Sequence, residues 1–123
     1  MQDYCERITI VEGSDLSLSG RALVELLQAV VQKGVPARFQ AKGFSMSPFI
    51  RDKDVVTISP LKHKQPRLGD IIAFAHPETG GLYIHRIVRK KEGMVVTKGD
   101  NISQTTDECV PRENILGFLT SVQ

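Results

Sequence analysis

A serine and a histidine in this sequence stand in settings that suit nucleophilic chemistry. Ser45 lies in the segment GFSMSP at 43–48, between Gly43, which tolerates backbone angles that other residues avoid, and Pro48, which ends any helix. We therefore expect Ser45 on a tight, shaped loop. Glycine, serine and proline also build ordinary turns, so this segment alone does not define a catalytic site.

A serine hydroxyl is a weak nucleophile at neutral pH until a neighbouring base takes its proton. His85 is a candidate base, because the strand-like segment 83–87 would project it to the same side as Tyr83 and Ile87. A carboxylate on the other ring nitrogen would hold the histidine tautomer and stabilise the imidazolium, and both Asp107 and Asp100 are candidates. Since lone histidines and Gly-Asp-Asn turns are common, these residues by themselves indicate a candidate Ser/His/Asp set and no more.

Short strands are expected to position these side chains. Apolar residues recur at helical spacing between Leu23 and Val31, and Gly34 with Pro36 supplies the stop, which predicts one amphipathic helix. Strand-like segments, separated by turn residues, are found at 7–11, 37–41, 54–59, 70–75, 82–89, 94–98 and 114–122. This pattern predicts a mainly β domain, a coiled and partly closed antiparallel sheet with the helix packed on one side.

Composition excludes several classes of protein. The 123 residues suit one domain, and 16 basic against 14 acidic residues give a net charge of +2, too balanced to indicate a nucleic-acid partner. The sequence has no apolar run of about 18 residues and no basic, apolar leader, so we expect a soluble, cytoplasmic protein with no membrane span. Cys5 and Cys109 fit reduced thiols, and the scattered histidines give no metal-ligand spacing; we expect no metal and no cofactor.

Five segments, taken in order, resemble the type I signal peptidase superfamily. They are GFSMSP at 43–48, LGDIIAF at 68–74, HRI at 85–87, TKGDN at 97–101 and ILG at 115–117. The resemblance covers about residues 36–122, leaving 1–35 as an N-terminal strand and helix of the same single domain 1–123. It is greatest to the histidine-using branch found in the endoplasmic reticulum, in archaea and in some spore-forming bacteria. The fold it implies is the coiled, mostly antiparallel β structure of signal peptidases and self-cleaving SOS repressors.

The resemblance also implies roles for individual residues. Ser45 matches the nucleophile, His85 the general base, and Asp107 the acid that orients the histidine. Asp100 matches a second acid of the family, with either an orienting or a structural role. This chain has one additional residue between Asp100 and Asp107 relative to the family, so both stay candidates for the orienting acid. Further positions match structural parts of the motifs: Met46, Pro48, Gly69, Asp70, Arg86, Gly99 and Asn101.

Two features depart from the family pattern. Many signal peptidases carry a serine two positions before the nucleophile that helps to hold the oxyanion, whereas this chain has Gly43. The loss of one such donor costs on the order of a hundredfold in rate, unless backbone amides of Gly43, Phe44 and Ser45 replace it. The second departure is the missing membrane anchor, which leaves membrane or partner association open.

The sequence therefore predicts a soluble serine endopeptidase-like protein that acts on an extended peptide or protein substrate. Resemblance implies that the substrate adds as a strand beside the site, with small side chains preferred near the cut. An alternative is a catalytically weak or inactive peptide-binding or partner-docking module of the same fold. A third reading is a self-cleaving regulator; it is disfavoured because residues 1–42 hold one clear helix and because the base is a histidine.

Overall fold

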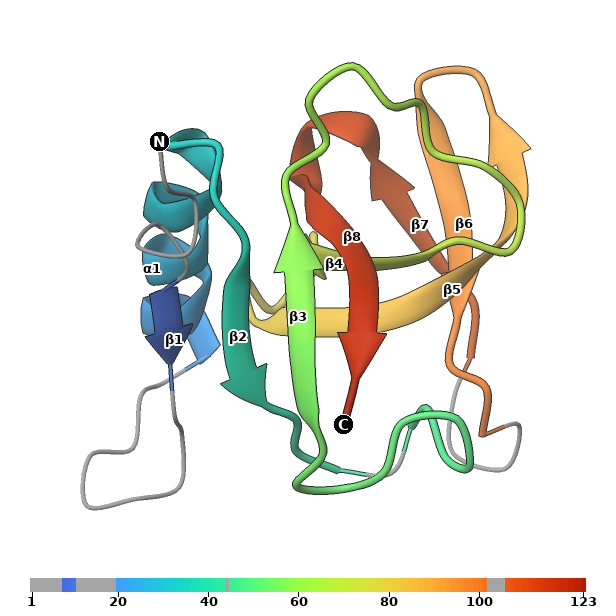
Figure 1. Ribbon diagram of the computed structural model, residues 1–123. Coiled ribbons are helices and arrows are strands. Elements are labelled where there is room, and N and C mark those ends of the chain that lie inside the picture. The colour runs from blue at the N-terminus through green and yellow to red at the C-terminus, as the bar shows by residue number, and fades with distance from the viewer. Residues whose placement is uncertain (1–7, 11–19, 44, 102–105) are drawn as a thin grey trace.

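The computed structural model of the chain describes residues 8–10, 20–43, 45–101 and 106–123 (Figure 1). The described residues form one α-helix, one short 3-10 helix and eight strands. In chain order these are β1 (Ile8–Ile10), α1 (Gly20–Gln32), β2 (Ala37–Gln40), β3 (Val55–Ser59), β4 (Ile71–Ala75), β5 (Leu82–Lys91), β6 (Met94–Lys98), β7 (Glu108–Pro111), η3 (Arg112–Asn114) and β8 (Ile115–Val122).

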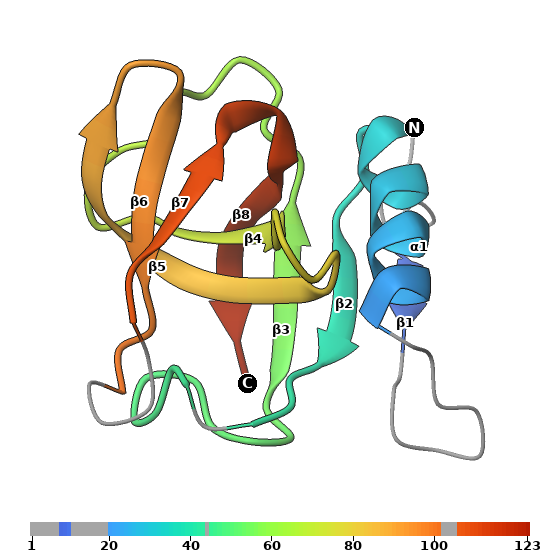
Figure 2. The same ribbon diagram turned by 180° about the vertical axis from the view of Figure 1, so that it is seen from behind.

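All strands belong to one sheet, in the order β1-β2-β3-β8-β4-β5-β6-β7. From β2 to β7 every neighbouring pair is antiparallel, while β1 pairs parallel to β2. The predicted mainly β class with one N-terminal helix is confirmed. The sheet is open rather than partly closed, because its order has two ends, yet it bends so strongly that β4 and β5 run across β3 and β8 (Figures 1 and 2).

Helix α1 forms where the sequence pattern predicts it. Leu23, Val24, Leu27 and Val30 form its buried stripe, as expected when apolar residues recur at three and four positions. The helix ends at Gln32. Gly34, just beyond it, has a φ of +79°, a left-handed conformation that favours glycine, and its N–H donates to the Val31 carbonyl. The helix packs beside β2 at one end of the bent sheet (Figure 2).

The bend gives strand β5 a different core on each of its faces. Leu82 and Ile84 pack against a cluster that includes α1, β2 and β3, with Leu27 at its centre. Tyr83 and Ile87 belong to a second cluster, built around Phe74 and enclosed by β4 to β8. Because side chains alternate along a strand, one short segment of β5 contributes to both clusters.

Gly117 in β8 packs closely against the neighbouring strand β3. A Cβ added at Gly117 would lie 2.4 Å from the Ser59 carbonyl oxygen and 2.7 Å from Cγ2 of Ile58. Both atoms belong to β3, which is hydrogen-bonded to β8 and cannot withdraw without breaking the ladder. Gly117→Ala is therefore expected to lower the free energy of unfolding by about 2–3 kcal/mol, measured by urea denaturation.

Gly81 supplies the matched control for this prediction. Its added Cβ would meet the Thr79 hydroxyl at 3.5 Å and Tyr83 at 4.0 Å, which are ordinary contacts. Gly81→Ala should change stability by less than about 0.5 kcal/mol. Equal effects at the two glycines would contradict the close β3–β8 approach.

Candidate active site

Ser45 is held on a loop that is tied at both ends. Gly43 has a φ of +91°, and its N–H donates to Oδ1 of Asp52 at 2.8 Å. The carbonyl of Ser45 accepts the N–H of Asn101 at 2.8 Å, so the loop is joined to the segment that follows β6. The Ser47–Pro48 peptide is cis. The expectation of a shaped loop around Ser45 thus corresponds to a set of specific backbone contacts.

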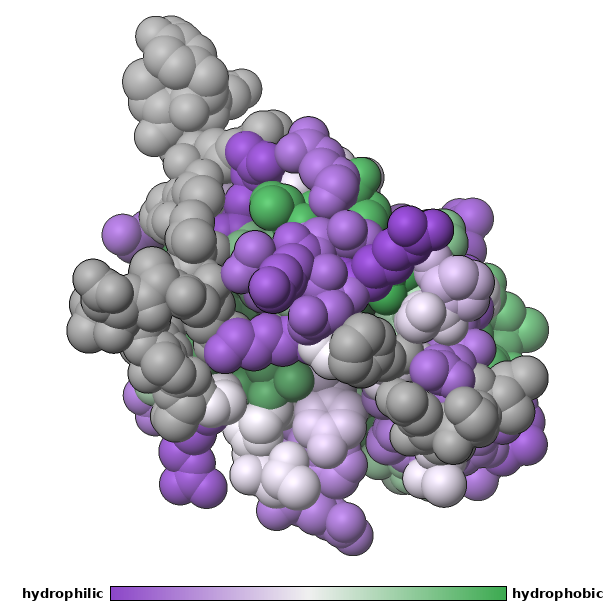
Figure 3. Space-filling model, turned by 90° about the horizontal axis from the view of Figure 1, so that it is seen from below, coloured by the Kyte–Doolittle hydropathy of each residue, from purple (hydrophilic) through white to green (hydrophobic). Residues whose placement is uncertain are grey.

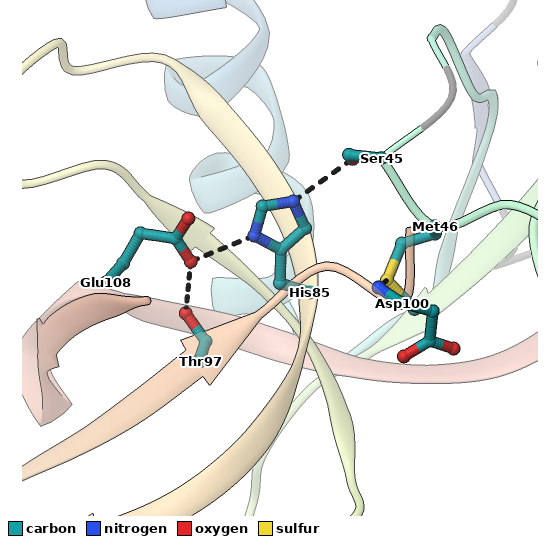
Figure 4. A network of polar contacts seen from close by, with 6 residues as sticks. All are labelled: Ser45, Met46, His85, Thr97, Asp100 and Glu108. Atoms are coloured by element: carbon teal, nitrogen blue, oxygen red, sulfur yellow. Dashed lines mark hydrogen bonds and ion pairs between the residues drawn. The ribbon is translucent and has the colours of Figure 1, made fainter. Parts of the chain in front are cut away.

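The side chains of Ser45, His85 and Glu108 form a continuous chain of contacts (Figure 4). Nε2 of His85 lies 3.1 Å from Oγ of Ser45, and Nδ1 of His85 lies 2.9 Å from Oε1 of Glu108. Thr97 donates its hydroxyl to the same Glu108 oxygen at 2.7 Å. The His85 side chain is 4% exposed and that of Glu108 is 11% exposed, so water competes little for these bonds.

These contacts determine which nitrogen of His85 carries the proton. An ionised Glu108 can only accept hydrogen bonds, so Nδ1 of His85 must donate to it. In the neutral ring Nε2 is then unprotonated and can accept the Ser45 hydroxyl proton. The edge of the ring also faces Tyr83 at a centroid distance of 5.5 Å, and this packing limits its rotation. The arrangement is that of a serine with its base oriented by a carboxylate.

The carboxylate on His85 is Glu108, and neither Asp107 nor Asp100 contacts the ring in the structure. Asp107 precedes β7 and points toward solvent, with Oδ2 3.7 Å from Nη2 of Arg89. Asp100 forms a two-bond ion pair with Arg86. The expected carboxylate of Asp107 is therefore replaced in the structure by that of the next residue, Glu108.

The sequence pattern missed β7, and with it Glu108. This strand is only four residues long and ends at Pro111, which argues against a central strand. Its position at the edge of the sheet, paired with β6 alone, explains why the proline is tolerated. Thr97 and Glu108 are direct partners in that pairing, which places the carboxylate beside His85. The segment 108–111 reads Glu-Cys-Val-Pro, which has no polar–apolar alternation, so the sequence offered no signal for this strand.

Arg86 and Asp100 tie the segment after β6 to the rest of the site. The Arg86 guanidinium donates to both carboxylate oxygens of Asp100, at 2.9 and 2.8 Å, and to the carbonyl of Gly69 at 3.0 Å. The hydrogen bond to Asp100 raises the pKa of Arg86 above its usual value against the opposing effect of partial burial, so the guanidinium stays charged. The Asp100 N–H also faces the sulfur of buried Met46 at 3.3 Å.

The Arg86–Asp100 pair is expected to contribute to stability. Because both side chains are mostly shielded from water, Arg86→Gln should lower the free energy of unfolding by about 1–2 kcal/mol in urea denaturation. Arg89→Gln is the matched control. Its contact with Asp107 is long and joins two exposed side chains, so it should cost less than about 0.5 kcal/mol. A larger loss at Arg89 than at Arg86 would contradict this assignment.

Other motif residues have structural contacts. The Asp70 carboxylate accepts the N–H of Arg67 at 2.9 Å, and its carbonyl accepts the N–H of Ile87, which closes the turn before β4. Gly69 in the same turn has a φ of +89°. The Gly43 N–H is bound to Asp52 and so is not free to hold an oxyanion. Phe44 lies outside the described residues, as does Cys5.

A cleft with a volume of about 990 Å³ opens beside Ser45 and His85. One wall is the end of β2 with residues 41–43, and the other contains residues 82–85 of β5. Among the described residues this part of β5 pairs with β4 only, since pairing with β6 begins at Arg86, and its outer edge is unpaired there. Viewed from below, the molecule is mostly hydrophilic, with hydrophobic colour in the recesses between polar side chains (Figure 3).

Other kinds of site are not indicated by the part of the chain that the structure describes. In the described ranges, His, Cys, Asp and Glu side chains do not gather in threes as metal ligands. The described helices are too short or too polar to cross a bilayer. Cys109 carries a free, exposed thiol at the cleft.

A bent antiparallel sheet that presents a serine, a histidine and a carboxylate at an open strand edge defines a serine-peptidase-like protein. Residues 15–119 match the family described as Peptidase S24-like, so the chain belongs to that family. This match supports the superfamily of signal peptidases and self-cleaving repressors that the sequence motifs resemble. No curated protein matches the chain.

Proposed function

We propose that the protein is a serine endopeptidase in which Ser45 is the nucleophile, His85 the general base and Glu108 the orienting acid. One observation carries the proposal: Oγ of Ser45 lies 3.1 Å from a histidine nitrogen whose opposite nitrogen is held by a buried carboxylate. Such geometry is what activation of a serine hydroxyl requires. The histidine base fits the histidine-using branch of the signal peptidase superfamily.

The contacts define a complete proton path. In acylation, Oγ of Ser45 attacks the substrate carbonyl carbon while Nε2 of His85 takes the hydroxyl proton. Glu108 stabilises the resulting imidazolium, which then gives the proton to the leaving amine as the peptide C–N bond breaks. In deacylation a water molecule repeats the sequence and releases the acid. Thr97 keeps Glu108 in place throughout, because its hydroxyl donates to the oxygen that faces His85.

The oxyanion donors must come from the backbone near the nucleophile. Since the Gly43 N–H is used by Asp52, we assign the Ser45 N–H as a donor. Because the Gly43 N–H is already bound to Asp52, turnover is expected to be slow. This is the observation that favours the second candidate function, a peptide-binding module of the same fold with little or no turnover.

We place the substrate as an extended strand along residues 82–85 of β5. The unpaired edge there offers backbone hydrogen bonds to a peptide, and the facing wall at 40–43 provides the second side of the groove. Alternate substrate side chains would enter the recess lined by Leu23, Phe39 and Ile84. That recess favours small or apolar side chains near the cut.

The proposal is tested by a serine-directed covalent probe together with a panel of peptides that carry small residues at alternate positions. We expect the probe to label Ser45, located by mass spectrometry, and the peptides to be cut at a single bond. Tight peptide binding with no labelling and no turnover would instead establish the binding module. A truncated product formed by the protein alone, at a rate independent of its concentration, would identify a self-cleaving regulator.

A further inference from the structure

The cleft has two chemically different sides, because β5 presents alternate residues to each. Leu82 and Ile84 lie on the side of the apolar recess, next to Leu23 and Phe39. Tyr83 and His85 lie on the other side. A strand bound along the β5 edge would alternate in the same way, so every second substrate side chain would face Tyr83 rather than the recess.

Tyr83 belongs to an aromatic wall whose other ring is fixed by backbone hydrogen bonds. The ring of His76 packs against Tyr83 at a centroid distance of 4.4 Å, with the two ring planes tilted by 40°. Nδ1 of His76 accepts the backbone N–H groups of Glu78 and Thr79 at 3.1 and 3.2 Å. These bonds hold the His76 ring beside Tyr83.

Two carboxylates border this wall. Glu78 follows His76 in the β4–β5 turn, and Asp107 precedes Glu108; both are exposed and both line the cleft. The contact of Asp107 with Arg89 is 3.7 Å long and exposed to solvent, so it competes weakly with another cation. Lys42 comes from the opposite wall, after β2. The Tyr83 side of the cleft thus places two exposed carboxylates near an electron-rich ring, and the guanidinium of Arg21 packs beside Gly80 in the same turn as Glu78.

We propose that the cleft selects a lysine or arginine side chain at the substrate position that faces Tyr83, between positions that take small or apolar residues. The cation would lie over the Tyr83 and His76 rings and interact with Glu78 and Asp107. This specificity deepens the proposed function and rests on it. Glu108 does not compete for the substrate cation, because its carboxylate is already hydrogen-bonded to His85 and Thr97.

The experiment compares peptides that differ at one position, with lysine, arginine, norleucine or glutamate, scanned across the residues on both sides of the cut. A basic residue at one position should raise kcat/KM by about 5- to 30-fold over norleucine, and less at high salt. Tyr83→Leu and Glu78→Gln should each reduce that ratio. Tyr83→Phe, which keeps the ring face, should retain it, and Glu92→Gln in the distant β5–β6 turn is the charge-matched control.

Binding of the same peptides to the Ser45→Ala variant gives a readout that does not depend on turnover. In the Ser45→Ala background, the protein that keeps Glu78 should bind the basic peptide more tightly than the protein that also carries Glu78→Gln. This result supports the inference even if the protein is an inactive binding module. Cleavage or binding with no preference for a basic residue at any scanned position overturns it while leaving the proposed function intact. Loss of the preference in Glu92→Gln to the same extent as in Glu78→Gln would also overturn it, since the effect would then reflect overall charge.

Discussion

Replacing Ser45 or His85 with alanine is expected to reduce kcat/KM for peptide cleavage by about 10⁴- to 10⁶-fold. The two side chains act as one unit, because the hydroxyl is activated only through its 3.1 Å contact with Nε2. The double variant should therefore be no slower than the slower single variant. Additive losses would show that the two residues work independently and would contradict the mechanism.

The chain supplies close controls for both changes. Ser47→Ala alters a serine of the same loop, and His63→Ala removes an exposed histidine from the turn after β3. Each should retain kcat/KM within about twofold, as expected for positions outside a catalytic unit. Unfolding in urea should be measured for all variants, so that lost activity is not confused with lost folding. Cleavage that survives in a folded Ser45→Ala variant would refute a Ser45 nucleophile.

Glu108→Gln is expected to lower kcat by about 10²- to 10⁴-fold with a much smaller change in KM. Glutamine keeps the size of the side chain but removes the negative charge that stabilises the His85 imidazolium 2.9 Å away. The amide can also turn its NH₂ group toward Nδ1, which would favour the wrong histidine tautomer. Steady-state kinetics on a peptide without basic residues measures this effect separately from substrate selection.

The same amide substitution at other acids tests the assignment. Asp107→Asn changes the neighbouring carboxylate, which points to Arg89, and should cost at least tenfold less than Glu108→Gln on the neutral peptide. Glu113→Gln, in the exposed 3-10 helix, should have no effect. If Asp107→Asn were the more damaging change, Asp107 would be the orienting acid in the working enzyme and β7 would have to shift by one residue.

Much of the fold could be predicted from local patterns. The seven strands expected from alternation are present within two residues of their expected bounds, as far as the described residues extend, and the helix lies where apolar periodicity placed it. Ser45 and His85 were candidates because their segments are distinctive in sequence. The carboxylate that contacts His85 was not among the candidates, because Asp100 and Asp107 match the motif whereas Glu108 begins a four-residue edge strand that ends in proline.

The sequence by itself determined the mainly β class, the amphipathic helix, and the two residues whose types suit nucleophilic chemistry. Alternation and glycine–proline punctuation act over a few neighbours, so they can be read from the chain directly. Only the tertiary structure decided that Glu108 contacts His85, that Arg86 pairs with Asp100, and that the edge of β5 beside Ser45 is unpaired among the described residues. Those contacts join residues far apart in the chain, and they depend on strand pairing and sheet bending that no local pattern encodes.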